Sequence, residues 1–508
     1  MTGLTHQLPV LQVVVPLFGA ILTAFLRRGT IAWFITSLVC FAAFANAVAL
    51  THAVYATAEP ISYVMGPWSV PFGIEYRVDR LNVFVLLLVT AVGAVAMPFA
   101  RKSVASEIDS HQQAWFYTMY LLCLAGLLGI TVTGDAFNVF VFLEISSLST
   151  YVLIALGRNR RALLAAYQYL IVGTIGATLY VIGIGLLYLV TGSLNLADIS
   201  SRLGDASVAF SRPVIAAFAF IAVGVSLKLA LFPLHVWLPN AYAYAPSIAT
   251  ILLAGTATKV AVYLLIRFFY SIFGSALPFT NLPIVEVMLV LSVAAMVLAS
   301  LSAAFEADAK RMLAYSSVAQ IGYMTLGISL ANQSGLTGGI VHMLNHGIMK
   351  AALFMALAAV AYRWALSDAG QRSKSIRIAD LAGVGRQMPL TMAVFVIAGL
   401  GLIGVPGTAG FISKWYLVVG AIEAGLWPLA FVIVASSLIA VVYVGRAVEA
   451  AYFREPPAGK DVVRDPPLSM LAPLLVLGAA TIYFGIETSW TAGLARDAAA
   501  MLLGGLKP

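Results

Sequence analysis

The chain has 508 residues, of which 61% are apolar and only 10% are charged. Soluble domains contain about 25% charged residues, so this composition excludes a soluble protein and indicates a polytopic membrane protein. The net charge is +8, but the basic residues lie in short loops between apolar runs, which favours a role in membrane orientation over nucleic-acid binding.

A helix that crosses a membrane needs about 20 mainly apolar residues. By this measure the sequence predicts an all-α polytopic membrane protein with about fourteen transmembrane helices. Their expected limits are 9–26, 31–52, 80–100, 115–133, 136–156, 162–190, 213–236, 246–272, 283–305, 311–331, 335–362, 390–419, 424–450 and 467–487. The loop 61–79 contains two short β-prone runs around Gly and Pro residues, which predicts a small hairpin outside the membrane.

The basic residues predict the orientation of the chain. The loops after odd-numbered spans contain 17 Lys and Arg residues, whereas the loops on the other face contain six. Because Lys and Arg are enriched in cytoplasmic loops, both termini are expected on the outer side of a bacterial cell (inner) membrane.

The seventh and twelfth spans are predicted to be broken. Pro233 interrupts the seventh, and Pro406, among several glycines, interrupts the twelfth. Proline removes a helix hydrogen bond, and the freed backbone is tolerated in lipid only where protein or a water-filled cavity satisfies it. Each break has a lysine nearby, Lys228 in one case and Lys414 in the other.

The two broken spans are five apart, and an odd offset reverses the direction of a helix in the membrane. The fourth to eighth and the ninth to thirteenth spans are therefore expected to form two inverted repeats, at 115–272 and 283–450. The first three helices and the hairpin occupy 1–114, and a C-terminal helix and tail occupy 451–508.

Ionisable side chains in the middle of these spans are the candidate functional residues. Each costs at least about 2.5–3.5 kcal/mol at the centre of a bilayer, so together they predict a path for ions or protons. The predicted transport residues are Glu144, Lys228, Lys259, His342, His346, Lys350 and Lys414. Asp135, which marks a helix start, and His235 are secondary candidates.

Glu144 and Lys228 form the expected pair of the first half. Glu144 lies about two and a half turns after Asp135, which places it well inside the membrane. Lys228 lies about one turn before the break, where snorkelling to the interface is a poor alternative. A structural ion pair is the alternative for Glu144, whereas a pair that separates and rejoins would load and release a proton.

The second half carries a polar helix face. His342, His346 and Lys350 are spaced i, i+4 and i+8, which puts all three on one side of a helix. Histidine titrates near neutral pH and can relay protons through either ring nitrogen. The alternatives are a hydrogen-bonded structural cluster and a zinc site. Lys259 is expected to connect the halves, and Lys414 to be the terminal carrier; a structural role is the alternative for both.

The sequence has no nucleotide-binding loop, flavin fingerprint, haem-attachment motif or iron–sulfur cysteine run. No cofactor is therefore expected, and the chain has no means of carrying electrons. It also lacks a nucleophile–base set for hydrolysis. We expect a transporter without catalytic chemistry of its own, driven by an ion gradient or by partner subunits.

Five motifs resemble the antiporter-like subunits shared by Mrp-type Na⁺/H⁺ antiporters, complex I and membrane-bound hydrogenases. They are FNVFVFLEISSLSTY (137–151), SLKLALFPLHVWLPNAYAYAPS (226–247), ADAKRMLAYSSVAQIGY (307–323), HMLNHGIMKAALF (342–354) and GVPGTAGFISKWYL (404–417). The resemblance covers most of the chain, and within the family it is greatest to the D subunit of Mrp antiporters.

The resemblance implies fourteen helices, inverted five-helix repeats and a hydrophilic axis halfway across the membrane. It assigns Glu144 and Lys228 to the family's glutamate–lysine pair, Lys259 to the connecting lysine and Lys414 to the carrier of the twelfth helix. His346 and Lys350 match the region of the eleventh helix, and His342 lies in the same motif.

The resemblance also implies partners: other membrane subunits of a hetero-oligomeric antiporter, with H⁺ and Na⁺ as the transported ions. The main alternative is a proton-pumping subunit of a redox complex, either an NADH-quinone oxidoreductase, of which the chain would form part, or a membrane-bound hydrogenase. Two further alternatives are an inorganic-carbon uptake assembly and a membrane scaffold with an inactive axis.

Overall fold

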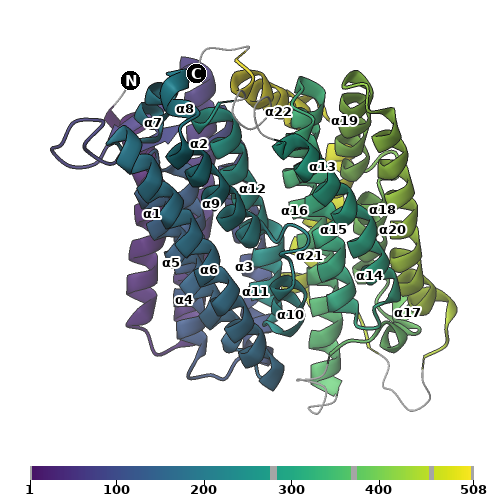
Figure 1. Cartoon of the computed structure of the whole chain (residues 1–508). Helices are drawn as coiled ribbons and strands as arrows, with labels where there is room; N and C mark the ends of the chain where they lie inside the picture. Colours follow the sequence, from purple (N-terminus) through teal and green to yellow (C-terminus); the bar gives the residue numbers. More distant parts are fainter. Residues whose placement is uncertain (1–2, 275–282, 368–374, 457–462, 505–508) are drawn as a thin grey trace.

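Apolar runs form helices throughout the computed structural model, which describes residues 3–274, 283–367, 375–456 and 463–504. Figure 1 shows long helices standing side by side in one bundle. The helices of residues 3–274 are α1 (Gly3–Ala24), α2 (Gly29–Thr57), α3 (Arg80–Glu107), α4 (Gln113–Val132), α5 (Ala136–Ala155), α6 (Arg160–Thr191), α7 (Leu196–Arg202), α8 (Ala206–Ala209), α9 (Arg212–Leu229), α10 (Trp237–Tyr244), α11 (Ser247–Leu252), η1 (Leu253–Ala257), α12 (Thr258–Ile266) and η2 (Arg267–Ile272).

The remaining helices follow the same order as the expected spans. They are α13 (Ile284–Ala294), η4 (Ala295–Ala299), α14 (Ser300–Phe305), α15 (Ala309–Ser329), α16 (Gln333–Ser367), η6 (Ile378–Leu381), α17 (Val384–Gln387), α18 (Pro389–Ile403), α19 (Ala409–Glu423), α20 (Trp427–Phe453), α21 (Leu468–Ile486) and α22 (Ser489–Leu502). Within the described ranges, twelve helices are long and apolar enough to cross a membrane. The expected spans 311–331 and 390–419 fall on α15 and on the shorter pair α18 and α19.

The predicted breaks are present in both places. α9 ends at Leu229, Ala230 adopts a left-handed conformation, and the helical path resumes only with α10. α18 ends before Gly404, which has φ of +93°, and α19 begins after Gly407, which has φ of +84°. Glycine adopts positive φ without strain, so these two residues allow the chain to turn between the half-helices.

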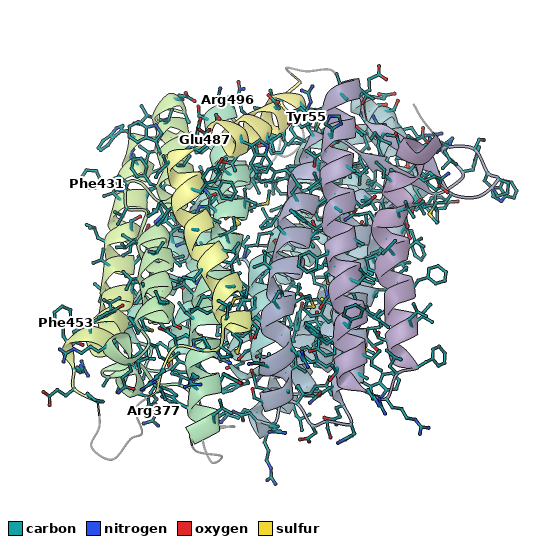
Figure 2. The ribbon with its side chains drawn as sticks, turned by 180° about the vertical axis from the view of Figure 1, so that it is seen from behind. Tyr55, Arg377, Phe431, Phe453, Glu487 and Arg496 are labelled. Atoms are coloured by element: carbon teal, nitrogen blue, oxygen red, sulfur yellow. The ribbon has the colours of Figure 1, made fainter. Side chains whose placement is uncertain are left out.

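The predicted hairpin is also present. β1 (Ile61–Val64) and β2 (Glu75–Val78) pair antiparallel, with Ile61 opposite Val78. We call the end of the bundle that carries this hairpin the hairpin face, and the other end the opposite face. Figure 2 places Glu487 and Arg496 at the hairpin face and Arg377 at the opposite face.

Four helical segments form the centre of the bundle. The membrane-crossing parts of α3, of α4, of the continuous run α11–η1–α12–η2, and of α16 are mostly or completely buried. α16 packs against α15, α18, α19 and α21 on one side and against α3 and α11 on another, whereas α6 packs against α5 and α9. The predicted transport residues lie on or next to this centre.

Candidate functional site

Lys228 and Glu144 are neighbours, but they do not touch. Lys228 lies in the last turn of α9 and is buried, and its Nζ donates to Ser147 Oγ on α5. Glu144 lies one turn earlier on α5; both residues are in the described part, and no ion pair joins them. Glu144 Oε1 is buried without a hydrogen-bond partner. Lys228 therefore donates to Ser147, whose own hydroxyl donates to the Leu143 carbonyl oxygen at 2.6 Å, and not to the carboxylate that the sequence predicts as its partner.

Aromatic rings and a glycine shape the surroundings of Lys228. The Lys228 Nζ lies 5.8 Å from the centre of the Tyr169 ring, which stacks on Trp237 with centroids 3.9 Å apart. A Cβ at Gly173 of α6 would lie 2.0 Å from the Tyr151 hydroxyl and 3.4 Å from Lys228 Nζ. Only glycine therefore leaves room for the phenol and the ammonium group together.

A small cavity leads from Lys228 towards α12. It has a volume of about 30 Å³ and is lined by Ser147 and Lys228 on one side and by Ala257 and Ala261 on the other. One water needs about 10–15 Å³ of such space together with polar partners, so the cavity is large enough for water beside Lys228 and Ser147. Ala257 and Ala261 flank Lys259 in the sequence.

Lys259 is fully buried at the centre of the bundle, and its Nζ donates to the carbonyl oxygen of Ala254. That carbonyl belongs to η1, a π-helical turn, and such turns are frequent at functional sites. Close by, η1 packs closely against α16. A Cβ added to Gly347 of α16 would lie only 2.8 Å from the carbonyl oxygen of Gly255 in η1. Gly347 follows His346, which interacts electrostatically with Lys259.

The three predicted residues of α16 are all fully buried. The rings of His342 and His346 are parallel within 1°, with centroids 5.9 Å apart. Lys350 donates to the Leu313 carbonyl oxygen at 2.7 Å and to Ser316 Oγ. Within the described part of the chain, neither ring nitrogen of His346 has a hydrogen-bond partner. His346 is thus the one of these three α16 residues whose side chain is held in place only by packing.

The predicted transport residues continue from His346 through His342 to Lys414. We call the seven of them together the row: Glu144, Lys228, Lys259, His342, His346, Lys350 and Lys414. The ring nitrogens of His342 contact Ser413 Oγ at 2.7 Å and Gln320 Oε1 at 2.9 Å. Lys414 Nζ donates to the carbonyl oxygens of Leu402 and Ile403, at 3.0 and 2.8 Å, and lies 4.7 Å from the centre of the Tyr323 ring. The two carbonyls end α18, where the negative end of the helix dipole favours a cation.

The two secondary candidates lie off this row. Asp135 is the N-cap of α5 and accepts a hydrogen bond from the Asn138 backbone N–H at 2.7 Å. His235 lies in the break between α9 and α10, with its ring stacked on Phe232 and 6.4 Å from the Tyr315 ring. Within the described residues, neither side chain forms a hydrogen bond, ion pair or ring contact with the row from Lys228 to Lys414.

A polar vestibule at the hairpin face was not predicted. It has a volume of about 470 Å³, and its lining includes Asp79, Asn82, Tyr263 and Arg267. Arg267 forms an ion pair with Asp79 and donates to Asn82 Oδ1 at 2.6 Å and to the Tyr263 hydroxyl at 3.2 Å. Tyr263 lies one turn beyond Lys259 on α12, so the vestibule reaches within about a turn of the central lysine.

Residues 133–440 match the family described as NADH:quinone oxidoreductase/Mrp antiporter, TM. The chain belongs to this family. The matched residues begin just before α5 and extend into α20, so they include every residue of the row from Glu144 to Lys414.

Named relatives come from two kinds of assembly. The N subunit of the NADH-quinone oxidoreductase of Desulforudis audaxviator is 40% identical over 499 residues, covering 95% of this chain and 96% of the relative. The D subunit of the Na⁺/H⁺ antiporter of Alkalihalophilus pseudofirmus is 30% identical over 421 residues, covering 83% and 82%. A chain of the Mrp complex from Dietzia sp. DQ12-45-1b superimposes with a TM-score of 0.88 at 26% identity, covering 99% and 98%.

This member of the NADH:quinone oxidoreductase/Mrp antiporter family is therefore a multi-pass, antiporter-like membrane subunit that works with other membrane subunits. The vestibule could not be predicted from the sequence because Asp79 and Arg267 are 188 residues apart. Each looked like an isolated charge at the end of a span. The only signal was that Arg267 and Lys259 lie on the same apolar run, two helical turns apart.

Proposed function

We propose that this chain carries protons through the membrane as a subunit of an antiporter that exchanges a monovalent cation, Na⁺, for protons. The observation behind the proposal is the row of ionisable groups that runs through the bundle centre from the half-buried Glu144 to the buried Lys228, Lys259, Lys350, His346, His342 and Lys414. Groups this deep in a membrane are costly and are retained where they transport ions.

Each group has a part in the proposed path. Movement of Glu144 towards Lys228 would compete with Ser147 for the ammonium group, and withdrawal would release it. The cavity beside Lys228 would hold water against Ala257 and Ala261, on the helical run that also carries Lys259, the next group of the proposed path. Charges interact strongly at low dielectric constant. A change in the charge of Lys259 would therefore alter the electrostatic potential at the His346 ring, across the η1–α16 contact. His342 and Ser413 would pass it on to Lys414.

The chain's orientation is part of the proposal. The excess of Lys and Arg in the loops of the opposite face supports a cytoplasmic location for that face, in a bacterial cell membrane. Both termini, the hairpin and the vestibule would then lie on the outer side. The vestibule, with its Asp79–Arg267 pair, would connect the outer solution to the region next to Lys259.

A second candidate is a proton-pumping subunit of a redox complex. The 40% identity with the N subunit of an NADH-quinone oxidoreductase, over nearly the whole of both chains, favours it. The TM-score of 0.88 with a chain of an Mrp complex favours the antiporter. The proton path is the same in both, and the source of energy differs.

The test uses everted vesicles that contain the whole assembly, with a pH-sensitive dye inside. For the antiporter, a pulse of Na⁺ dissipates an imposed pH gradient in the wild type, and Glu144→Gln abolishes the response. The matched control is Glu449→Gln, because Glu449 is exposed and pairs with Arg454 at 2.8 Å, outside the row. Exchange that survives Glu144→Gln contradicts the path. Proton uptake that requires NADH and ignores Na⁺ supports the redox candidate instead.

A further inference from the structure

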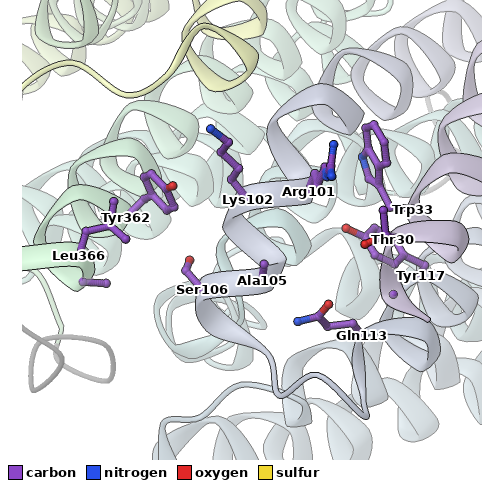
Figure 3. Close-up of a pocket in the computed structure, with 12 residues that line it drawn as sticks. Thr30, Trp33, Arg101, Lys102, Ala105, Ser106, Gln113, Tyr117, Tyr362 and Leu366 are labelled. Atoms are coloured by element: carbon purple, nitrogen blue, oxygen red, sulfur yellow. The ribbon is translucent and has the colours of Figure 1, made fainter. Parts of the chain in front are cut away.

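A basic pocket lies at the opposite face, where the ends of α2, α3, α4 and α16 meet (Figure 3). Its volume is about 420 Å³, within the range of about 300–1,000 Å³ that is usual for small-molecule sites. The polar and aromatic side chains that line it include Trp33, Arg101, Lys102, Gln113, Tyr117 and Tyr362. None of them belongs to the row of buried ionisable groups.

The pocket carries positive charge without a counter-ion. Among the described residues that line it there is no carboxylate, and neither Arg101 nor Lys102 makes an ion pair in that part of the chain. The two acidic residues that follow Arg101 and Lys102 most closely in the sequence are engaged elsewhere. Glu107 accepts from the Ser247 backbone N–H at 2.8 Å, and Asp109 pairs with Arg158 at 2.7 Å. An anionic ligand would therefore supply the missing charge.

Trp33 holds one of the two cations in place. Its indole N–H donates to the Met97 carbonyl oxygen at 2.8 Å, which fixes the ring against α3. The Arg101 guanidinium lies 5.2 Å from the centre of that ring, the geometry of a cation–π contact. Tryptophan is also enriched where a membrane meets water. The cation is thus positioned at the depth of the lipid headgroups.

The pocket adjoins a surface suited to acyl chains. Thr30 lines it, and Phe34 follows Thr30 by one turn on the same face of α2. Phe34 is 62% exposed, and Leu38, one turn further into the membrane, is 63% exposed. A molecule with its head in the pocket could therefore lay apolar chains along α2.

We propose that this pocket binds the phosphate headgroup of an anionic glycerophospholipid from the adjacent leaflet. The phosphate would lie between the guanidinium of Arg101 and the ammonium of Lys102, because guanidinium groups bind phosphate oxygens through two parallel hydrogen bonds. Gln113 and Tyr362 offer polar groups to the glycerol end, and the acyl chains follow Phe34 and Leu38. Basic pockets between transmembrane helices are known to accept acidic lipids in this way.

The test titrates delipidated full-length chain with phosphatidylglycerol in detergent and counts bound lipid by native mass spectrometry. Arg101→Gln with Lys102→Gln is expected to weaken the first binding step about 30-fold, since each basic residue contributes about 1 kcal/mol. The matched control removes two charges from exposed residues of the same face that do not line the pocket, Arg27→Gln in the loop before α2 with Arg160→Gln at the start of α6. It should bind as the wild type does.

A conservative variant separates loss of charge from loss of the folded state. Arg101→Lys keeps the positive charge, so it should retain most of the affinity for phosphatidylglycerol. The proposal is overturned if the double variant binds phosphatidylglycerol as tightly as the wild type, or if phosphatidylcholine binds equally well. Complete displacement by millimolar inorganic phosphate would identify a free-anion site instead. In the assembled complex, crosslinks from the pocket to an acidic segment of a neighbouring subunit, without bound lipid, would identify a protein occupant and would also overturn it.

Discussion

At the scale of single residues, each buried lysine of the row has a neutral oxygen partner. Lys228 donates to a serine hydroxyl, Lys259 to a backbone carbonyl, Lys350 to a carbonyl and a serine hydroxyl, and Lys414 to two carbonyls at the end of α18. A carboxylate partner would bind each ammonium group more tightly and would hinder its loss of a proton. Neutral oxygens therefore suit lysines that must change charge during transport, and the Glu144 carboxylate is near enough to Lys228 to influence the first of them electrostatically.

His346 and His342 allow function and stability to be separated. His346→Phe removes a ring with no hydrogen bond to the described protein, so the thermal unfolding temperature should change little. Proton flux should fall by about a hundredfold, the lower end of what a positioned proton-transfer group contributes. His342→Phe should lower both the proton flux and the unfolding temperature. It removes the hydrogen bonds of the ring to Ser413 and Gln320, which costs about 1–3 kcal/mol in stability.

The measurements are flux in vesicles and thermal unfolding of the purified chain. A His346→Phe variant with normal flux would remove this residue from the proposed path. A variant that loses stability as strongly as His342→Phe would instead indicate a structural histidine cluster.

At the scale of elements, two helix starts have the same geometry at opposite ends of the bundle. Asp135 caps α5 and bridges to Asn195, which lies just beyond α6. Asp308 caps α15 and bridges to Arg377, which lies beyond α16. Each bridge consists of two backbone hydrogen bonds between the residues on either side of the bridged pair. This repetition at an offset of five spans supports the proposed inverted repeats.

Much of this level could be predicted from the sequence. Long apolar runs determined the helices, and Pro233 and Pro406 marked both breaks. The π-helical turn before Lys259 had no sequence signal, because it depends on how η1 packs against α16. The hydrogen-bond partners of the lysines could not be predicted from the sequence either, because the direction of a side chain at a helix break depends on three-dimensional packing. Sequence identified which residues form the row, but not what each one touches.

Gly173 tests the close packing of α6 around Lys228. Gly173→Ala would place a methyl group 2.0 Å from the Tyr151 hydroxyl, so it should destabilise the chain by about 1–3 kcal/mol through overpacking. Gly185→Ala is the matched control on the same helix, because nothing lies within 4 Å of its Cβ position. Thermal unfolding of the two variants should differ clearly, and equal unfolding temperatures would contradict the crowding.

At the scale of the whole molecule, the hairpin face and the opposite face differ in their cavities and in the charge of their loops. The hairpin face carries the vestibule above Lys259, whereas the opposite face carries the basic pocket and most of the loop Lys and Arg residues. The direction in which the chain sits in the membrane therefore decides which solution reaches the vestibule. That direction rests on loop charge alone and can be measured directly.

Cysteine labelling of intact cells gives this measurement, because the two native cysteines, Cys40 and Cys123, are buried and should react slowly. Ser69→Cys introduces a thiol at an exposed position of the hairpin loop, and Ser110→Cys introduces one in the exposed loop between α3 and α4 on the opposite face. If the hairpin face is outside, a membrane-impermeant maleimide labels Ser69→Cys in intact cells and labels Ser110→Cys only after the cells are broken. The reverse pattern would make the vestibule cytoplasmic and would reverse the direction of the proposed proton path, and equal labelling of both in broken cells is the control for reactivity.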